Sequence, residues 1–328
     1  MLAVTGALAE SDARNIRMAD ATSPPPAAPS KGKVFLRRLT SSIILWTLVL
    51  SALFSGNKLL SDYVFLLIMM VLSGFGLMEF YAMVEKRGLA CFKIIGIVGG
   101  LALMMGTFLH VTGRLGIHGT PARVNDFETS FLILFVLGLC LRQFVSKASA
   151  SGILAVSTTL FGLMYVPWLL NFVQKITFFP FPSASHAETG HFYVLYFILV
   201  TKFSDMGAYC VGSLIGKHKM IPRVSPGKTW EGFGGAIVVS TGISLVFAHL
   251  AGPRLYGMTW VHAMILGVVL SVGAVVGDLI ESIFKREAGL KDSGKFFPGI
   301  GGILDLLDSL LFNAPLMYLY LRHVLTHD

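Results

Sequence analysis

The sequence predicts an all-α fold, a polytopic integral membrane protein with about nine transmembrane helices. Of its 328 residues, 54% are hydrophobic and only 13% are charged, whereas soluble domains carry about 25% charged residues. The mean hydropathy is +0.73. Apolar runs recur along the chain, and most of them approach the roughly 20 residues that a helix needs to cross the hydrocarbon core. Because lipid cannot satisfy an open backbone, these runs are predicted to be helices.

The first 33 residues form a polar leader that ends in SPPPAAPSKGK. The leader has no apolar core, so it is not a secretory signal. It is either a disordered tail or the result of a start codon placed too early, and we assign it no chemistry.

Apolar segments then follow to the end of the chain. They cover residues 41–56, 60–84, 94–112, 128–145, 152–173, 191–215, 234–251, 259–283 and 303–323. We divide them into N-terminal transmembrane helices over 34–190 and a C-terminal catalytic region over 191–328, where the polar motifs lie.

Lys and Arg residues set the orientation, because cytoplasmic loops of membrane proteins are enriched in them. With the leader in the cytoplasm, nineteen of the 26 basic residues fall on that side and six on the other, with Lys202 left inside a span. The polar loops 216–233 and 284–302 then face the cytoplasm. We therefore expect a bacterial cytoplasmic (inner) membrane, with the site on its cytoplasmic side. The net charge of +8 lies in short clusters between apolar runs, which argues against a nucleic-acid partner.

The three cysteines, Cys91, Cys140 and Cys210, are far apart and embedded in apolar sequence. No Cys-x-x-Cys or Cys/His spacing occurs, so neither disulfides nor zinc are expected.

Four acids flank the second polar loop as two pairs, Asp278 with Glu281 and Asp305 with Asp308. The spacing of three residues puts each pair on one helix face. A carboxylate at the centre of a membrane helix costs roughly 2.5–3.5 kcal/mol, so such groups are usually functional. Oxygen ligands beside a phosphate-binding loop suit Mg²⁺, and Asp278, Asp305 and Asp308 are the predicted ligands. The alternative for the later pair is capping of a helix N-terminus.

Basic and hydroxyl residues accompany these acids. Lys285, Arg286, Lys291 and Lys295 lie in the same loop, followed by the turn Pro298–Gly302. The earlier loop contains Ser225-Pro-Gly-Lys-Thr229, which offers hydroxyls, amides and an ammonium to phosphate. It is not a Walker A motif. A solvated basic loop is the alternative, with Glu231 pairing Lys228. Lys202 and Asp205, three residues apart, could likewise only neutralise each other.

Together these motifs have a defined order. The downstream series is Ser282, Lys285-Arg286, Lys291-Asp292, Pro298, Gly301-Gly302, Asp305 and Asp308. The upstream series is Asp205, Gly207-Ala208-Tyr209, Gly216-Lys217, Ser225-Pro226, Lys228-Thr229 and Glu231-Gly232. This order resembles the phosphatidate cytidylyltransferase (CDP-diacylglycerol synthase) family. Two positions depart from the family pattern, because Ile300 and Leu306 stand where it has His and Arg.

The resemblance implies transfer of CMP from CTP to phosphatidate, giving CDP-diacylglycerol and pyrophosphate. It implies Mg²⁺, alone or with a second cation, at Asp278, Asp305 and Asp308, and a homodimer. Catalytic roles then fall to Lys285, Arg286, Lys291 and Asp292. Substrate binding falls to Asp205, Tyr209, Ser225, Lys228, Thr229, Glu231 and Ser282.

Two other classes of function remain open at this point. One is a related CTP-dependent lipid enzyme, either a polyprenol kinase or a cytidylyltransferase for another lipid phosphate. The other is a non-enzymatic membrane protein, either a transporter or a non-catalytic homologue. A transporter needs polar residues at several depths of the membrane, whereas here they gather at one predicted face, which favours an enzyme.

Overall fold

The computed structural model describes residues 40, 46–51, 53–54, 56–114, 116, 120–145, 152–182, 188–294 and 301–326. Within these residues, eight helices are long and apolar enough to cross a membrane. They correspond to the predicted spans from 60–84 onward, so the all-α polytopic fold is confirmed. The leader lies outside the described residues, as do residues 41–45, 52 and 55 of the first predicted span, 41–56.

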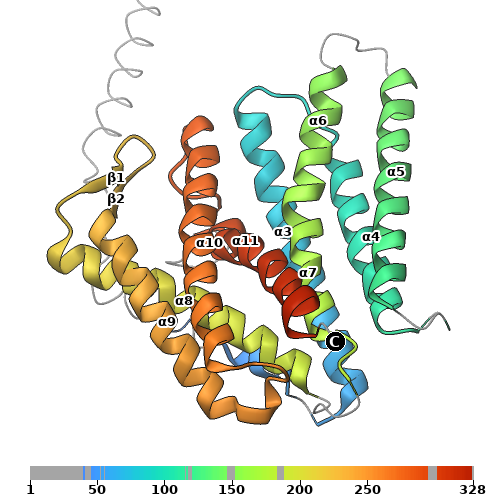
Figure 1. The fold of residues 1–328 in the computed structure, drawn as a ribbon. Coiled ribbons are helices and arrows are strands. Elements are labelled where there is room, and N and C mark those ends of the chain that lie inside the picture. The colour runs from blue at the N-terminus through green and yellow to red at the C-terminus, as the bar shows by residue number, and fades with distance from the viewer. Residues whose placement is uncertain are drawn as a thin grey trace, which may run out of the picture.

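The N-terminal helices stand side by side in Figure 1. They are α3 (Lys58–Lys86), α4 (Lys93–Val111), α5 (Pro121–Val145) and α6 (Gly152–Leu163), and α6 continues through a π-helical turn (Met164–Trp168) into α7 (Leu169–Thr177). Pro167 lies inside that turn, and a proline removes one backbone donor from a helix. Helix α5 begins seven residues before the predicted 128, because the polar residues of its first turns are helical.

The C-terminal helices are α8 (Thr189–Ile215), α9 (Trp230–Ala251), α10 (Trp260–Glu287) and α11 (Ile303–Tyr320), with a 3₁₀ turn after α9 (Gly252–Arg254) and a π turn after α11 (Leu321–Leu325). Helix α10 extends past the predicted 283. Lys285 and Arg286 therefore lie on its last turn and not in a loop.

A small antiparallel hairpin joins α8 to α9. Its strands are β1 (Lys219–Ile221) and β2 (Ser225–Thr229). The segment Ser225–Thr229 is thus an extended strand. Thr229 ends the strand and caps α9, since its hydroxyl accepts a hydrogen bond from Gly232 N at 3.1 Å.

Glycines let α8 and α9 pack closely. A Cβ atom on Gly207 would lie 2.9 Å from the carbonyl oxygen of Gly235, and one on Gly235 would lie 3.0 Å from that of Gly207. Backbones that approach this closely leave no room for larger side chains. The close contact holds the hairpin beside α8.

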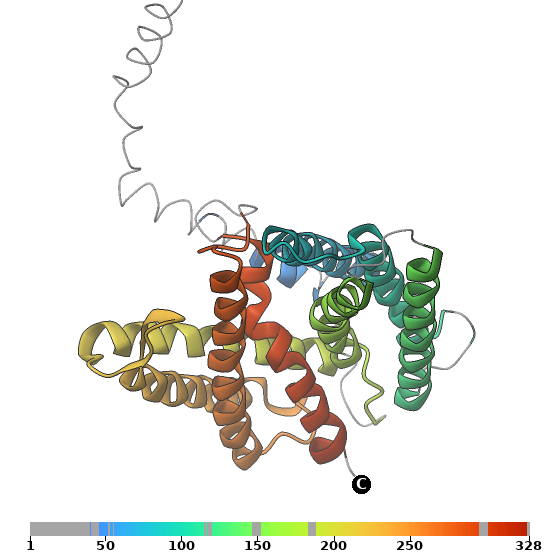
Figure 2. The same cartoon turned by 90° about the horizontal axis from the view of Figure 1, so that it is seen from above.

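Helix α11 lies in the middle of the molecule, against α10, α7 and α3 (Figures 1 and 2). The main buried apolar cluster extends across these helices and includes Leu77, Val166, Phe197, Leu270 and Leu307. The polar residues at the start of α11 are therefore held by packing from both the N-terminal and the C-terminal helices.

Candidate active site

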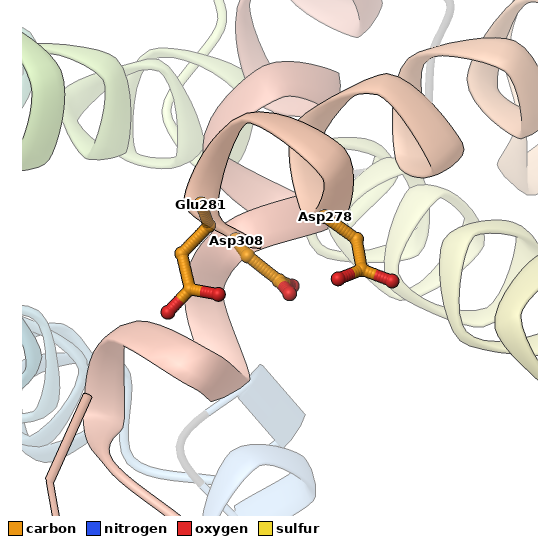
Figure 3. Close-up of side chains that lie close together, drawn as sticks. All are labelled: Asp278, Glu281 and Asp308. Atoms are coloured by element: carbon orange, nitrogen blue, oxygen red, sulfur yellow. The ribbon is translucent and has the colours of Figure 1, made fainter. Parts of the chain in front are cut away.

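Three carboxylates from α10 and α11 converge at one point. Asp278 and Glu281 come from α10 and Asp308 from α11, and the carboxylate of Asp308 lies between the other two (Figure 3). One oxygen of each lies within 4.8 Å of the others. We call these three residues the acid group. Asp308 Oδ1 accepts a hydrogen bond from Ser309 N at 2.5 Å, which fixes the orientation of its side chain.

Glu281 is the most buried member of the acid group, with no exposed surface. Its carboxylate forms an ion pair with Lys285, one turn later on α10. Neither of its oxygens accepts a hydrogen bond of ordinary geometry from the described residues. A buried carboxylate whose one cationic partner is the Lys285 ammonium is still costly, and a bound cation would offset that cost. The acid group therefore fits a divalent cation with oxygen ligands.

Asp305 lies apart from the acid group. Its Oδ1 accepts a hydrogen bond from Lys285 Nζ at 2.6 Å. Its Oδ2 accepts from Gly302 N at 2.7 Å and from Ser293 N at 3.0 Å. These contacts are those of a helix cap. The structure thus brings Asp278 and Asp308 together, as predicted, but places Glu281 where the sequence suggested Asp305.

Glu79 of α3 also binds the start of α11. Its two oxygens accept hydrogen bonds from Ile303 N at 3.0 Å and Leu304 N at 2.8 Å, and Ser293 Oγ donates to it at 3.0 Å. Sequence analysis did not select Glu79. Its only signal was an acid inside the apolar run 60–84, more than 210 residues before its partners.

A polar cavity of about 490 Å³ opens beside the acid group, between α8, the hairpin, α9 and α10. Five predicted substrate-binding residues line it, namely Asp205, Tyr209, Ser225, Lys228 and Thr229, together with Asp278. Lys228 Nζ lies 2.8 Å from Asp278 Oδ2 and donates to Val275 O at 3.2 Å. The ammonium of Lys228, which comes from the hairpin, therefore lies at the edge of the acid group.

Two other predicted substrate-binding residues have different neighbours. Glu231 accepts from His218 N, at 3.2 Å from each carboxylate oxygen, and lies 2.6 Å from His218 Nδ1. It ties the end of α8 to α9 and does not pair with Lys228. Ser282 donates to Asp278 Oδ1 at 3.4 Å, so it supports a member of the acid group.

The basic residues that the sequence assigned to one loop have different surroundings in the structure. Lys285 is buried between Glu281 and Asp305. Arg286 is exposed and donates to Val224 O at 3.1 Å and to Leu290 O at 3.2 Å, which ties the hairpin to the end of α10. Lys291 and Asp292 are exposed, and the structure shows no contact between their side chains and the acid group among the described residues. Lys295, Pro298 and Ile300 lie outside the described residues.

Lys202 adds a cation that the sequence left unassigned. Its Nζ donates to Leu306 O at 3.0 Å and to Ser309 Oγ at 3.3 Å. It lies 3.9 Å from Asp205 Oδ2. The ammonium thus touches α11 within one turn of Asp308.

Comparison with known proteins decides the family. The profile of the cytidylyltransferase family matches residues 36–324. The chain belongs to the cytidylyltransferase family. This places it among the nucleotidyltransferases, as its motifs predicted.

Named relatives agree with this assignment. The chain is 30% identical over 285 residues to a phosphatidate cytidylyltransferase of Haemophilus influenzae, covering 85% of this chain and 96% of the relative. It is 31% identical over 291 residues to one of Staphylococcus epidermidis, covering 87% and 98%. It is also 34% identical over 165 residues to an uncharacterized protein, YnbB, of Escherichia coli. That match spans about half of each chain, 50% and 51%. The predicted resemblance is confirmed.

Proposed function

We propose that the chain transfers CMP from CTP to phosphatidate, giving CDP-diacylglycerol and pyrophosphate. The observation that carries the proposal is the position of Asp278, which belongs to the acid group and also lines the polar cavity. A nucleotide in that cavity would have its phosphates between Lys228 and the acid group. The names of the relatives supply the lipid.

The reaction exchanges one phosphoric anhydride bond for another. An oxygen of the lipid phosphate attacks the α-phosphorus of CTP and forms the new P–O bond. The bond from the α-phosphorus to the oxygen that bridges it to the β-phosphorus breaks, and that oxygen leaves with pyrophosphate. Because the attacking oxygen is already anionic, the protein need not supply a strong base. Its residues have to position the phosphates and offset their charge.

Lys228 is the residue best placed to bind the CTP phosphates, with Ser225 in the same strand and lining the same cavity. Lys285 acts differently in this proposal, since it is held between Glu281 and Asp305. It limits the repulsion between these carboxylates and so stabilises the acid group. Arg286 would position the hairpin through Val224 O.

The acid group is proposed to hold Mg²⁺ through Asp278, Glu281 and Asp308, alone or with a second cation. Asp305 gives way to Glu281 in this set, because the oxygens of Asp305 already accept three hydrogen bonds. When bound, the metal would offset the negative charge of the phosphates. The proposed setting is a cytoplasmic membrane with the site facing the cytoplasm. The family resemblance implies a homodimer.

The test uses purified full-length protein with phosphatidate, Mg²⁺ and CTP radiolabelled at either the α- or the γ-phosphate. The expected result is α-label on the lipid and γ-label in pyrophosphate. Label from the γ-phosphate on a lipid alcohol would show a CTP-dependent kinase instead. No transfer to any lipid, with CTP still bound, would favour a non-catalytic homologue.

A further inference from the structure

A second cavity of about 310 Å³ has Lys202 in its lining, whereas Lys202 does not line the polar cavity. Its walls are almost entirely apolar and come from α3, α7, α8, α11 and the described part of segment 46–54. They include Phe65, Val194, Phe197, Leu307 and Leu310. Lys202 is the one charged residue among those that line it.

An ion pair on α8 links the linings of the two cavities. Lys202 lines the apolar cavity and Asp205 lines the polar one. Their charged atoms are 3.9 Å apart. Any molecule with an apolar chain in one cavity and a polar end at Lys202 would present that end to the place where the CTP phosphates are proposed to lie.

The ammonium of Lys202 has an N–H donor available for such a ligand. A lysine ammonium has three N–H donors, and two of them are directed at Leu306 O and Ser309 Oγ. Its side chain is about a quarter exposed, at 28%. Ser309 is fully buried and donates its hydroxyl to Asp205 Oδ2 at 3.5 Å, so it holds the Lys202–Asp205 pair in place. An ammonium in the lining of an apolar cavity suits a phosphate monoester that carries a hydrocarbon chain.

We propose that this apolar cavity binds an acyl chain of the lipid substrate and that Lys202 binds its phosphate. The proposal rests on the proposed function for the identity of the lipid, phosphatidate. It assigns the two substrates to opposite sides of the Lys202–Asp205 pair. Lys202 then offsets the charge of the lipid phosphate as it approaches the acid group, a role that Leu306 cannot fill with its own side chain.

The first experiment measures binding without turnover. Phosphatidate carrying a diazirine on one acyl chain is photolysed with wild-type protein in detergent, without CTP, and labelled peptides are identified by mass spectrometry. Label is expected on Phe197, Leu307 or Leu310. Unlabelled phosphatidate should compete, whereas diacylglycerol and inorganic phosphate should not. Equal competition by diacylglycerol would overturn the role of Lys202, and label confined to outward-facing residues would overturn the whole proposal.

The second experiment separates the substrates kinetically. Lys202→Met should raise the KM for phosphatidate by at least about tenfold, because a charged hydrogen-bond donor to the lipid phosphate is lost. The KM for CTP should stay within about twofold. Lys202→Arg should recover part of the loss. If Lys202→Met raised both KM values equally, or if the Arg variant recovered nothing, Lys202 would be a structural residue and the proposal would fail.

The third experiment fills the cavity. Leu310→Trp should shift the preference toward phosphatidate with shorter acyl chains. Leu137→Trp on α5, an exposed apolar position, is the matched control and should leave the preference unchanged. An unchanged preference in Leu310→Trp would contradict the acyl-chain assignment. A wild type that bound phosphatidate in the cavity but transferred no CMP would refute the proposed function alone.

Discussion

Glu128 and Glu281 are both buried carboxylates inside membrane-spanning helices, but their surroundings differ. Glu128 Oε2 lies 2.5 Å from Lys175 Nζ and accepts from Trp168 Nε1 at 3.2 Å. Its Oε1 accepts from Thr107 and Asn171, each at 3.4 Å. Glu281 has an ion pair with Lys285 and no hydrogen-bond donor of ordinary geometry among the described residues.

The difference separates a structural polar group from a candidate ligand site. Lys175 is also satisfied, with Asn125 Oδ1 at 3.1 Å and the ring of Phe172 at 4.6 Å. A buried network that is fully paired rigidifies the helices that carry it. Glu281, beside two other acids and with Lys285 as its one cationic partner, still has oxygen lone pairs for a ligand from outside the chain. The first group should therefore govern stability, and the second should govern activity.

The largest expected effect is that of Asp308→Asn. It should lower turnover at least about a thousandfold, which is about 4 kcal/mol of barrier. The amide keeps the acceptor for Ser309 N but loses the charge that would bind a cation. Initial rates with CTP and phosphatidate test this, and the thermal unfolding midpoint should hardly change. Asp126→Asn, at an exposed site on α5, is the control. A near-normal rate at limiting Mg²⁺ would remove Asp308 from the cation site.

Glu128→Gln should produce the opposite pattern. It leaves the Lys175 ammonium buried without its counter-ion, and breaking such a pair typically costs about 3–5 kcal/mol of stability. We expect a lower unfolding midpoint in detergent, with activity per folded molecule within about twofold of wild type. Adding Lys175→Met should restore part of the stability. A loss of activity at an unchanged midpoint would show that this network takes part in the reaction.

Glu79→Gln should fall between these two variants. Two backbone N–H groups of α11 donate hydrogen bonds to Glu79, and in the variant one of them would face the NH₂ group of Gln. Leaving that N–H without an acceptor should lower the free energy of unfolding by about 1–3 kcal/mol. Both the unfolding midpoint and the rate should fall, and hydrogen exchange at the start of α11 should increase. Glu85→Gln, an exposed position on the same helix, is the control. Unchanged exchange at residues 302–305 would refute the role of Glu79 as a cap.

Lys228→Ala should have the smallest effect, and it acts on one substrate. The KM for CTP should rise about tenfold, or about 1.4 kcal/mol, because an ammonium lining the polar cavity is lost. The KM for phosphatidate should change less. Lys86→Ala, exposed at the end of α3, should change neither. If titrations showed the lipid KM rising instead, the polar cavity would not be the nucleotide site.

Hydropathy was sufficient to predict the spans that the structure describes, because lipid imposes both their length and their helical form. It failed at the start of α5 and the end of α10, where charged residues continue the helix. Lys285 is tolerated beyond the predicted end of α10 because its partner Asp305 comes from another helix. Glu128, the first residue of the predicted span, is likewise paired with Lys175 of α7. Sequence windows do not contain such partners.

Residue type and spacing were sufficient to predict that these acids belong to the site. They did not predict which acids would bind a cation and which would cap a helix. Both members of the Asp305–Asp308 pair could be ligands or caps. The choice depends on the segment before α11, which returns Ser293 to the helix start, and on Glu79 from a distant helix. These are tertiary contacts, and no local pattern encodes them.

The start of α11 has a consequence for anion selectivity. Free amides at a helix N-terminus attract phosphate, but here each of the first four has an acceptor within the protein. Gly302 N donates to Asp305, Ile303 N and Leu304 N donate to Glu79, and Asp305 N donates to Ser293 Oγ at 3.2 Å. These four amides are thereby closed to inorganic phosphate and to misplaced triphosphate, which leaves the binding of anions near the acid group to side-chain cations such as Lys202 and Lys228.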